Sequence, residues 1–125
     1  MRLLLDTHVL LWVMADDPSL SPAARSMVEQ AEIVYVSAVS LWEVSIKAGL
    51  GRLTIADGHF AERVREAGFE PLAITWSHAE AVRTLPDIHR DPFDRMLIAQ
   101  ALSEPLKLLT ADRALARYSD LVITI

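Results

Sequence analysis

The first predicted strand and helix lie in the stretch RLLLDTHVLLWVMA, residues 2–15. The apolar run after Arg2 predicts a short strand that ends at Asp6, and residues 7–15 predict a helix that follows without a loop. We expect this helix to stop at Asp16-Asp17-Pro18, because proline cannot continue the helical hydrogen bonds. A strand joined directly to a helix is the repeating unit of parallel α/β folds.

The same alternation of strand and helix continues along the chain. An N-cap followed by proline, as in Ser21-Pro22 and Asp91-Pro92, is a typical helix start. The alternation predicts an α/β fold with a mostly parallel sheet of about five strands, covered by helices on both faces. Further strands are expected over residues 33–37, 71–74, 106–110 and 121–125, and further helices over 22–31, 38–48, 57–67, 77–83, 92–104 and 111–118.

Length and composition limit the class of protein. The 125 residues fit one domain, residues 1–125, and 52% of them are hydrophobic, which is enough for a core. The net charge of -5 argues against a protein that binds nucleic acid simply by being basic. The chain has no cysteine, which excludes disulfides and thiolate zinc sites and is compatible with the reducing cytoplasm, where we expect the protein.

The apolar N-terminal segment is expected to be neither a secretion signal nor a membrane span. Asp6 and His8 interrupt the apolar run that the centre of a signal peptide requires, so we expect Asp6 to be retained in the mature protein. No apolar stretch of the sequence approaches the roughly 18 residues that a membrane-spanning helix needs.

Acidic residues follow several of the predicted strands. In open parallel sheets, ligands bind at the carboxyl ends of the strands. Asp6 ends the first strand, and Asp112 lies two residues after Thr110, the end of the fourth. Glu43 and Asp94 lie in helices whose N-termini point to the same edge. Carboxylates that converge there repel one another, and a hard divalent cation such as Mg²⁺ or Mn²⁺ relieves that repulsion.

Three of these acids also have a purely structural explanation. Asp6 can cap the helix that follows it, and Asp94 and Asp112 can lie in first helical turns, where an acid favours the helix dipole. Asp91, three residues before Asp94, is better explained as an N-cap. For each acid alone both explanations stay open, and the prediction of a site depends on the set.

The sequence around Glu43 favours burial of this side chain. Glu43 could form an exposed ion pair with Lys47, four residues further on. However, the helix over residues 38–48 is largely apolar and leaves only a narrow polar stripe, formed by Ser40, Glu43 and Lys47. Such a stripe is more typical of a buried site than of a solvated face.

At these acids the chain resembles a known family, through LLDTH (residues 4–8), SAVSLWE (37–43), HRDPFDR (89–95) and LTAD (109–112). These segments resemble the motifs of PIN-domain ribonucleases, and specifically of VapC-type toxins from bacterial toxin–antitoxin pairs. The likeness spans essentially the whole chain. It implies a PIN-like fold, a three-layer α/β/α sandwich with the first strand central in the sheet and the fourth strand beside it.

The resemblance also implies an activity, the cleavage of RNA that depends on Mg²⁺ or Mn²⁺. Thr110 matches a hydroxyl position that is often found at such sites. Some members carry a further acid just after the fourth, whereas Arg113 follows here, and this departure weakens the case for a second metal. The acids that match the quartet of the family are Asp6, Glu43, Asp94 and Asp112.

From these residues we expect hydrolysis of an RNA phosphodiester by an activated water. Asp6, Asp94 and Asp112 would provide most of the metal contacts, and Glu43 would bind metal or position the water. An acidic protein needs local positive charge to bind an anionic strand. The candidates near the site are Lys47, Arg52, Arg90, Arg95 and Arg113.

The predicted first helix is apolar nearly all round, from Val9 to Met14. Such a helix is either buried in the core or part of an interface. The resemblance implies a homodimer and a cognate antitoxin that covers the site, often with a basic residue that reaches the acids.

Other classes of protein fit the sequence less well. An aspartate-dependent phosphatase usually has a second acid two residues after the first, where this chain has His8, and a phospho-accepting receiver domain would have adjacent acids after the first strand. A zinc hydrolase is disfavoured because His8, His59, His78 and His89 show no ligand spacing. A non-catalytic module that binds nucleic acid or protein on the same fold remains the alternative.

Overall fold

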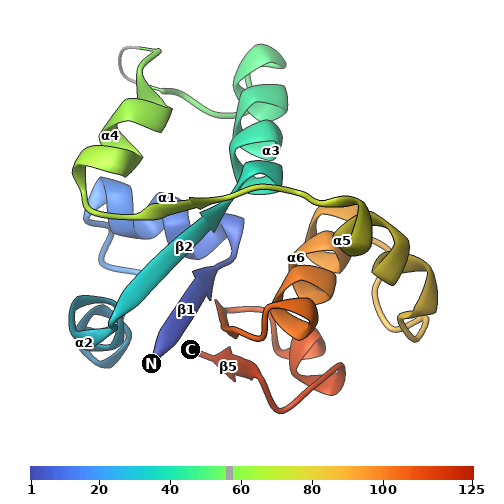
Figure 1. Ribbon diagram of the computed structural model, residues 1–125. Coiled ribbons are helices and arrows are strands. Elements are labelled where there is room, and N and C mark those ends of the chain that lie inside the picture. Colours follow the sequence, from blue (N-terminus) through green and yellow to red (C-terminus); the bar gives the residue numbers. More distant parts are fainter. Residues whose placement is uncertain (56–57) are drawn as a thin grey trace.

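The computed structural model describes residues 1–55 and 58–125, and within these residues a parallel sheet of five strands forms the centre of the molecule (Figure 1). The strands are β1 (Arg2–Leu5), β2 (Ile33–Ser37), β3 (Glu70–Leu72), β4 (Lys107–Thr110) and β5 (Val122–Thr124). They lie in the order β3-β2-β1-β4-β5, and all neighbours are parallel. The expected central position of the first strand, with the fourth beside it, is confirmed. The direction of strand order reverses between β1 and β4, which is where open α/β sheets bind their ligands.

Helices cover both faces of the sheet, as predicted. On one face lie α1 (Thr7–Ala15), α2 (Pro22–Gln30) and α4 (Phe60–Glu66), and on the other α6 (Pro92–Ser103), with α5 (Trp76–Ala81) beside it (Figure 1). Helix α3 (Ala38–Gly49) directly follows β2, and short 3₁₀ helices, η1 (Val82–Thr84) and η2 (Arg113–Arg117), follow α5 and β4. Among the described residues, no helix has the length and apolar character to cross a membrane.

The side chains of β1 alternate between two apolar clusters. Leu3 and Leu5 contribute to the cluster on the side of α1, α2 and α4, whereas Leu4 contributes to the cluster with α6 and η2. All three are fully buried. A strand with helices on both sides needs apolar side chains at every position, which explains the unbroken run of leucine before Asp6.

The apolar character of α1 is mostly explained by the core. Val9 and Leu10 are fully buried, and residues 11–14 are partly buried against the cluster on that face. Asp16 ends the helix in the left-handed region, with φ of 50°, a conformation that aspartate tolerates better than most residues.

Several predicted boundaries differ from the observed ones. The α-helix predicted over residues 111–118 is wrong, because η2 is a 3₁₀ helix, the form that short connections commonly take. The helix predicted over residues 77–83 ends at Ala81 and continues as η1. The predicted helix start at Asp57 lies outside the described residues, and α4 begins at Phe60. The strand predicted over residues 71–74 is the edge strand Glu70–Leu72, a position where the missing N–H of Pro71 is tolerated.

Candidate metal and active site

Asp6 connects the end of β1 to the start of α1. Its Oδ1 accepts a hydrogen bond from the backbone N–H of Val9 at 2.8 Å, so Asp6 is the N-cap of the helix. Its Oδ2 accepts a hydrogen bond from the hydroxyl of Thr110 at 2.5 Å. The side chain is buried, and its own backbone N–H donates to the carbonyl of Leu109 in β4. The capping role and a role at the site therefore coexist in one residue.

Thr110 links Asp6 to the segment that carries Asp112. The Thr110 hydroxyl donates to Asp6 and accepts from the backbone N–H of Asp112 at 3.0 Å. Asp112 in turn caps η2, because its Oδ1 accepts from the N–H of Ala114 at 3.0 Å. One buried hydroxyl thus sets the relative position of two of the predicted acids.

Asp94 lies in the first turn of α6, where the sequence places it. Asp91 is the N-cap, as predicted, and its Oδ1 accepts from the N–H groups of Phe93 and Asp94. Burial, together with the negative charges of Asp91, Asp6 and Glu43, raises the pKa of Asp94 to about 7. Burial also raises the pKa of Asp6, with a smaller contribution from the charge of Glu43.

Glu43 is buried in α3, and its side chain is only 5% exposed. The Nζ of Lys47 donates to its Oε2 at 2.7 Å, so the pair that the sequence suggested is formed, but the glutamate is not at the surface. The neighbouring member of the polar stripe, Ser40, accepts a hydrogen bond from Thr7 at 3.0 Å. Glu43 influences the pKa of both Asp6 and Asp94, which places its charge close to theirs.

A pocket of about 310 Å³ brings three of the four acids together. Asp6, Asp94 and Asp112 contribute to its wall from the ends of β1 and β4 and from the first turn of α6. Its other lining residues are His8, Trp12 and Ala111. The pocket lies at the carboxyl ends of β1 and β4, the edge of the sheet that the sequence indicates.

His89 is a member of this site that the sequence analysis did not identify. Its Nε2 lies 3.0 Å from Oδ2 of Asp112 and 3.7 Å from Oδ2 of Asp94. One ligand atom from each of these three residues falls within 4.8 Å of the others. The spacing of the histidines does not indicate this role, because His89 lies beside carboxylates and not beside other histidines. The available signal was its place at the start of the HRDPFDR segment.

The basic residues expected to contact RNA differ in what they contact in this structure. Lys47 is paired with Glu43, whereas the side chain of Arg90 is exposed at the surface. Arg95 donates hydrogen bonds to the carbonyls of Val82, Pro86 and His89 and to the hydroxyl of Tyr118. Its guanidinium is therefore engaged by the protein. Arg52 and Arg113 are exposed as well.

The donor atoms at this pocket fit a hard divalent cation. Carboxylate oxygens are the ligands that Mg²⁺ and Mn²⁺ prefer, and three carboxylates line the same small volume. Burial is the largest cause of the raised pKa of Asp94, and the negative charges of Asp91 and Asp6 add to it. A bound cation would stabilise the charged form of these carboxylates, so the residues present suit a metal of this kind.

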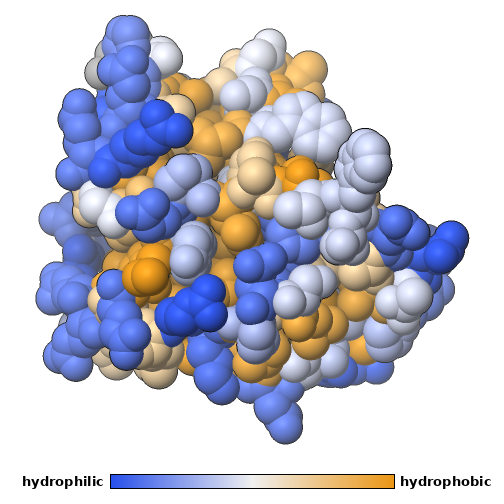
Figure 2. All heavy atoms as spheres, in the orientation of Figure 1, coloured by the Kyte–Doolittle hydropathy of each residue, from blue (hydrophilic) through white to orange (hydrophobic). Residues whose placement is uncertain are grey.

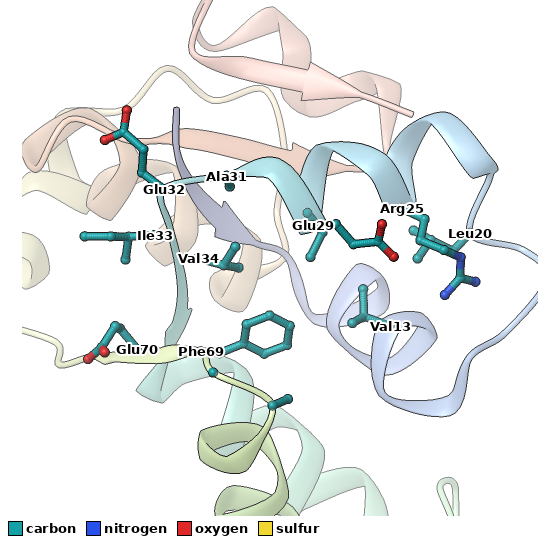
Figure 3. Close-up of a pocket in the computed structure, with 13 residues that line it drawn as sticks. Val13, Leu20, Arg25, Glu29, Ala31, Glu32, Ile33, Val34, Phe69 and Glu70 are labelled. Carbon is teal, nitrogen blue, oxygen red and sulfur yellow. The ribbon is translucent and has the colours of Figure 1, made fainter.

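A larger hollow lies at the other end of the strands (Figure 3). It has a volume of about 440 Å³, and Ile33 and Glu70, the first residues of β2 and β3, are part of its lining. Val13 and Phe69 contribute apolar surface, and Arg25 and Glu29 of α2 are charged residues of the same lining (Figure 3). Asp6, Asp94 and Asp112 lie at the opposite edge of the sheet, so this hollow is separate from the candidate site.

Two further hollows are mainly apolar. One of about 450 Å³ lies between α3 and α4, with Leu41, Val64 and Phe69 in its lining, and Figure 2 shows apolar surface between these helices. The other, of about 610 Å³, is lined by residues of α1, including Leu11, Trp12 and Met14, and of the segment after α3. Trp12 lines both this apolar groove and the acidic pocket, so the two adjoin.

The sequence of this chain is similar to those of known proteins. The sequence model of the PIN domain family matches residues 3–121. The chain is 34% identical over 121 residues to Ribonuclease VapC22 of Mycobacterium tuberculosis (strain ATCC 25618 / H37Rv), an alignment that covers 92% of this chain and 90% of the relative.

Solved structures of low sequence identity share the fold. VapBC2 from Rickettsia felis, in a structure with a DNA fragment from its promoter, is similar with a TM-score of 0.72 and 13% identity, covering 100% of this chain and 98% of that one. A toxin–antitoxin complex from Klebsiella pneumoniae is similar with a TM-score of 0.67 and 23% identity, covering 97% of this chain and 95% of that one.

Proposed function

The chain belongs to the PIN-domain family, and we propose that it is a metal-dependent endoribonuclease of the VapC type, the toxin of a bacterial toxin–antitoxin pair. The observation that carries this proposal is the single pocket lined by Asp6, Asp94 and Asp112, with the buried charge of Glu43 close by. The VapC ribonuclease among its relatives supports RNA as the substrate.

We propose that Asp6, Asp94 and Asp112 hold Mg²⁺ or Mn²⁺ through their carboxylates. When bound, such a cation supplies a Lewis acid that lowers the pKa of water and neutralises negative charge on a phosphate. The carboxylate of Asp6 is already oriented for metal binding, because Val9 and Thr110 each donate to one of its oxygens. The departure after Asp112, where Arg113 takes the place of an acid, favours one tightly held metal over two.

Glu43 is suited to position the attacking water or to take its proton. Its carboxylate is buried beside the site, and Lys47 balances its charge through one oxygen, Oε2. Within residues 1–55 and 58–125, no donor is bound to the other carboxylate oxygen, which can therefore accept a hydrogen bond from water. Hydrolysis would then proceed by attack of water on the phosphorus, in line with the departing ribose oxygen.

The RNA strand would approach over the exposed basic residues near the pocket. Arg90 is the strongest candidate for a phosphate contact, because it is exposed and directly follows His89. Lys47 could contact RNA while it remains paired with Glu43. For Arg95 we propose a positioning role in place of the RNA contact that the sequence suggested, because its guanidinium donates to the protein.

A cognate antitoxin would find an apolar groove next to the acids. Trp12 separates the groove over α1 from the acidic pocket and lines both. An apolar segment of the antitoxin lying in this groove could therefore place a following basic side chain against Asp94 or Asp112. The solved structure from Klebsiella pneumoniae, which has the same fold, is a toxin–antitoxin complex by name, and this supports such a partner.

A homodimer is supported by an apolar stripe along α3 that ends at its C-cap residue, Leu50. Trp42 and Leu50 are 60% and 63% exposed, and Ile46 lies between them at 36%. Residues spaced by four lie on one face of a helix, so the three form a continuous surface. Light scattering at micromolar concentration tests this proposal, and a strictly monomeric protein would remove it.

Incubation of RNA with the purified protein, with and without EDTA, tests the activity. We expect cleavage that stops on addition of EDTA and returns with excess Mg²⁺ or Mn²⁺. Cleavage that survives complete metal removal would exclude the proposed mechanism. Metal-independent binding of RNA without cleavage would favour the non-catalytic alternative.

A further inference from the structure

The imidazole of His89 has its two nitrogens in different hydrogen bonds. Nδ1 accepts from the backbone N–H of Asp91 at 3.1 Å, an arrangement within the loop that precedes α6. A ring nitrogen that accepts a hydrogen bond carries no hydrogen, so in the neutral imidazole the hydrogen resides on Nε2. His89 therefore presents an Nε2–H donor to the acids.

This donor is directed at Asp112. Nε2 lies 3.0 Å from Oδ2 of Asp112, at hydrogen-bond distance, and 3.7 Å from Oδ2 of Asp94, beyond that distance. Oδ1 of Asp112 already accepts from the N–H of Ala114. Each oxygen of Asp112 thus receives one hydrogen bond and keeps further lone-pair capacity for a cation.

The backbone of His89 is held on both sides by a clamp formed by Arg95 and Tyr118. The N–H of His89 donates to the hydroxyl of Tyr118 at 2.8 Å, and its carbonyl accepts from Nη1 of Arg95 at 3.3 Å. Nη1 of Arg95 also donates to the Tyr118 hydroxyl at 3.3 Å and to the carbonyl of Pro86 at 3.0 Å. Tyr118 follows η2 and Arg95 lies in α6, so the clamp ties this loop to both elements.

We propose that His89 is a positioning residue for Asp112, held in place by the Arg95–Tyr118 clamp, and that its Nε2–H orients the Asp112 carboxylate for the metal without binding the metal itself. The inference rests on the proposed function, because it assigns Asp112 to a metal. A metal on Nε2 would require the hydrogen to move to Nδ1, where it would face the N–H of Asp91. Two donors would then oppose each other at 3.1 Å. The bond to Asp91 therefore selects donation over ligation.

The positioning role is tested by measuring the Mn²⁺ affinity of the whole chain. MnCl₂ is titrated into the protein in a calorimeter, in the absence of RNA. Removing the partner of a metal-binding group typically lowers metal affinity roughly 10- to 100-fold, and we expect this loss for His89→Ala. His89→Gln should recover most of the affinity, because its amide N–H lies the same number of bonds from Cα as Nε2. Tyr118→Phe, which removes the acceptor for the His89 N–H, should lie between these variants. His59→Ala is the matched histidine control.

Nitrogen NMR of His89 separates donation from ligation. We expect Nε2 to keep its hydrogen in the metal-free protein and at saturating Mg²⁺, which is diamagnetic. Loss of that hydrogen on addition of Mg²⁺ would make His89 a ligand and overturn the proposal. So would wild-type Mn²⁺ affinity in folded His89→Ala. If His89→Ala does not fold, the test is the Mn²⁺ affinity of His89→Gln and of Tyr118→Phe relative to wild type.

Different results would contradict the proposed function and the proposed role of His89. A wild-type protein that binds neither Mn²⁺ nor Mg²⁺ would contradict the proposed function as a whole. A wild-type protein that binds metal and cleaves RNA, with His89→Ala behaving identically, would contradict only the role of His89. Measurement of kcat and KM for RNA is a further test, because loss of a group that positions Asp112 should affect kcat more than KM.

Discussion

Thr110 donates its hydroxyl hydrogen to Oδ2 of Asp6 at 2.5 Å, although 104 positions separate the two residues in the sequence. The contact exists because β1 and β4 are parallel neighbours, with Leu5 opposite Leu109. The residues that follow these partners, Asp6 and Thr110, consequently emerge together at the edge of the sheet. The first and last thirds of the chain thus meet at one buried hydrogen bond in the candidate site.

Replacement of Asp6 by Asn tests the metal-binding role of this carboxylate. Asn keeps the shape and an oxygen that can accept from Val9, but it removes the negative charge, so we expect cleavage to fall by about a thousandfold or more. The thermal midpoint should not decrease, because a buried charge has been removed. Asp120→Asn is the matched control at an exposed position. Full cleavage activity in Asp6→Asn would contradict the proposed site.

Replacement of Thr110 by Val tests the bridge between Asp6 and Asp112. Valine preserves the volume but removes a buried hydroxyl, leaving Oδ2 of Asp6 and the N–H of Asp112 without that partner. We expect the free energy of unfolding to fall by about 1–3 kcal/mol. Metal affinity should fall too, because the hydrogen bond from Thr110 lowers the pKa of Asp6. Thr110→Ser keeps the hydroxyl and should remain near wild type in urea unfolding and metal titration.

The raised pKa of Asp94 predicts a pH dependence of stability in the metal-free protein. Between the ordinary value of 3.8 and about 7, the folded protein binds more protons at Asp94 than the unfolded chain does. The free energy of unfolding therefore falls as pH rises through this window. Urea unfolding in EDTA at pH 5 and pH 8 should show a smaller fall in Asp94→Asn. Asp6, whose pKa is also raised, leaves part of the dependence in that variant. An equal fall in both proteins would show that Asp94 does not titrate in this range.

Charge reversal at Arg90 and at Arg95 should have different effects. Arg90 is exposed, so Arg90→Glu should weaken RNA binding and reduce the slope of log affinity against log salt concentration by roughly 0.7 per lost phosphate contact. Arg95→Glu should instead lower the free energy of unfolding, because the carbonyls of Val82 and Pro86 lose their donor. Both are measured on inactive Asp6→Asn protein, by RNA titration over a range of salt and by urea unfolding. If Arg90→Glu binds RNA like the parent, the basic surface lies elsewhere.

Much of the architecture could be predicted from short-range patterns. The leucine run before Asp6 predicts a strand buried on both faces, and Ser21-Pro22 and Asp91-Pro92 mark helix starts that the structure contains. These signals depend on neighbours within a few residues, so they are readable without knowledge of the fold. Element ends were less predictable, as in residues 111–118, where the short connection to β5 favours a 3₁₀ helix.

The role of single residues at the site depended on contacts that no local pattern encodes. The sequence places acids after strands and in first helical turns, because strand direction and helix caps follow from local periodicity and capping chemistry. Packing alone brings His89 to Asp112 and turns Arg95 toward carbonyls in place of solvent. These partners come from different elements, and only the parallel order of β1 and β4, with α6 on one face of the sheet, decides which side chains share a pocket.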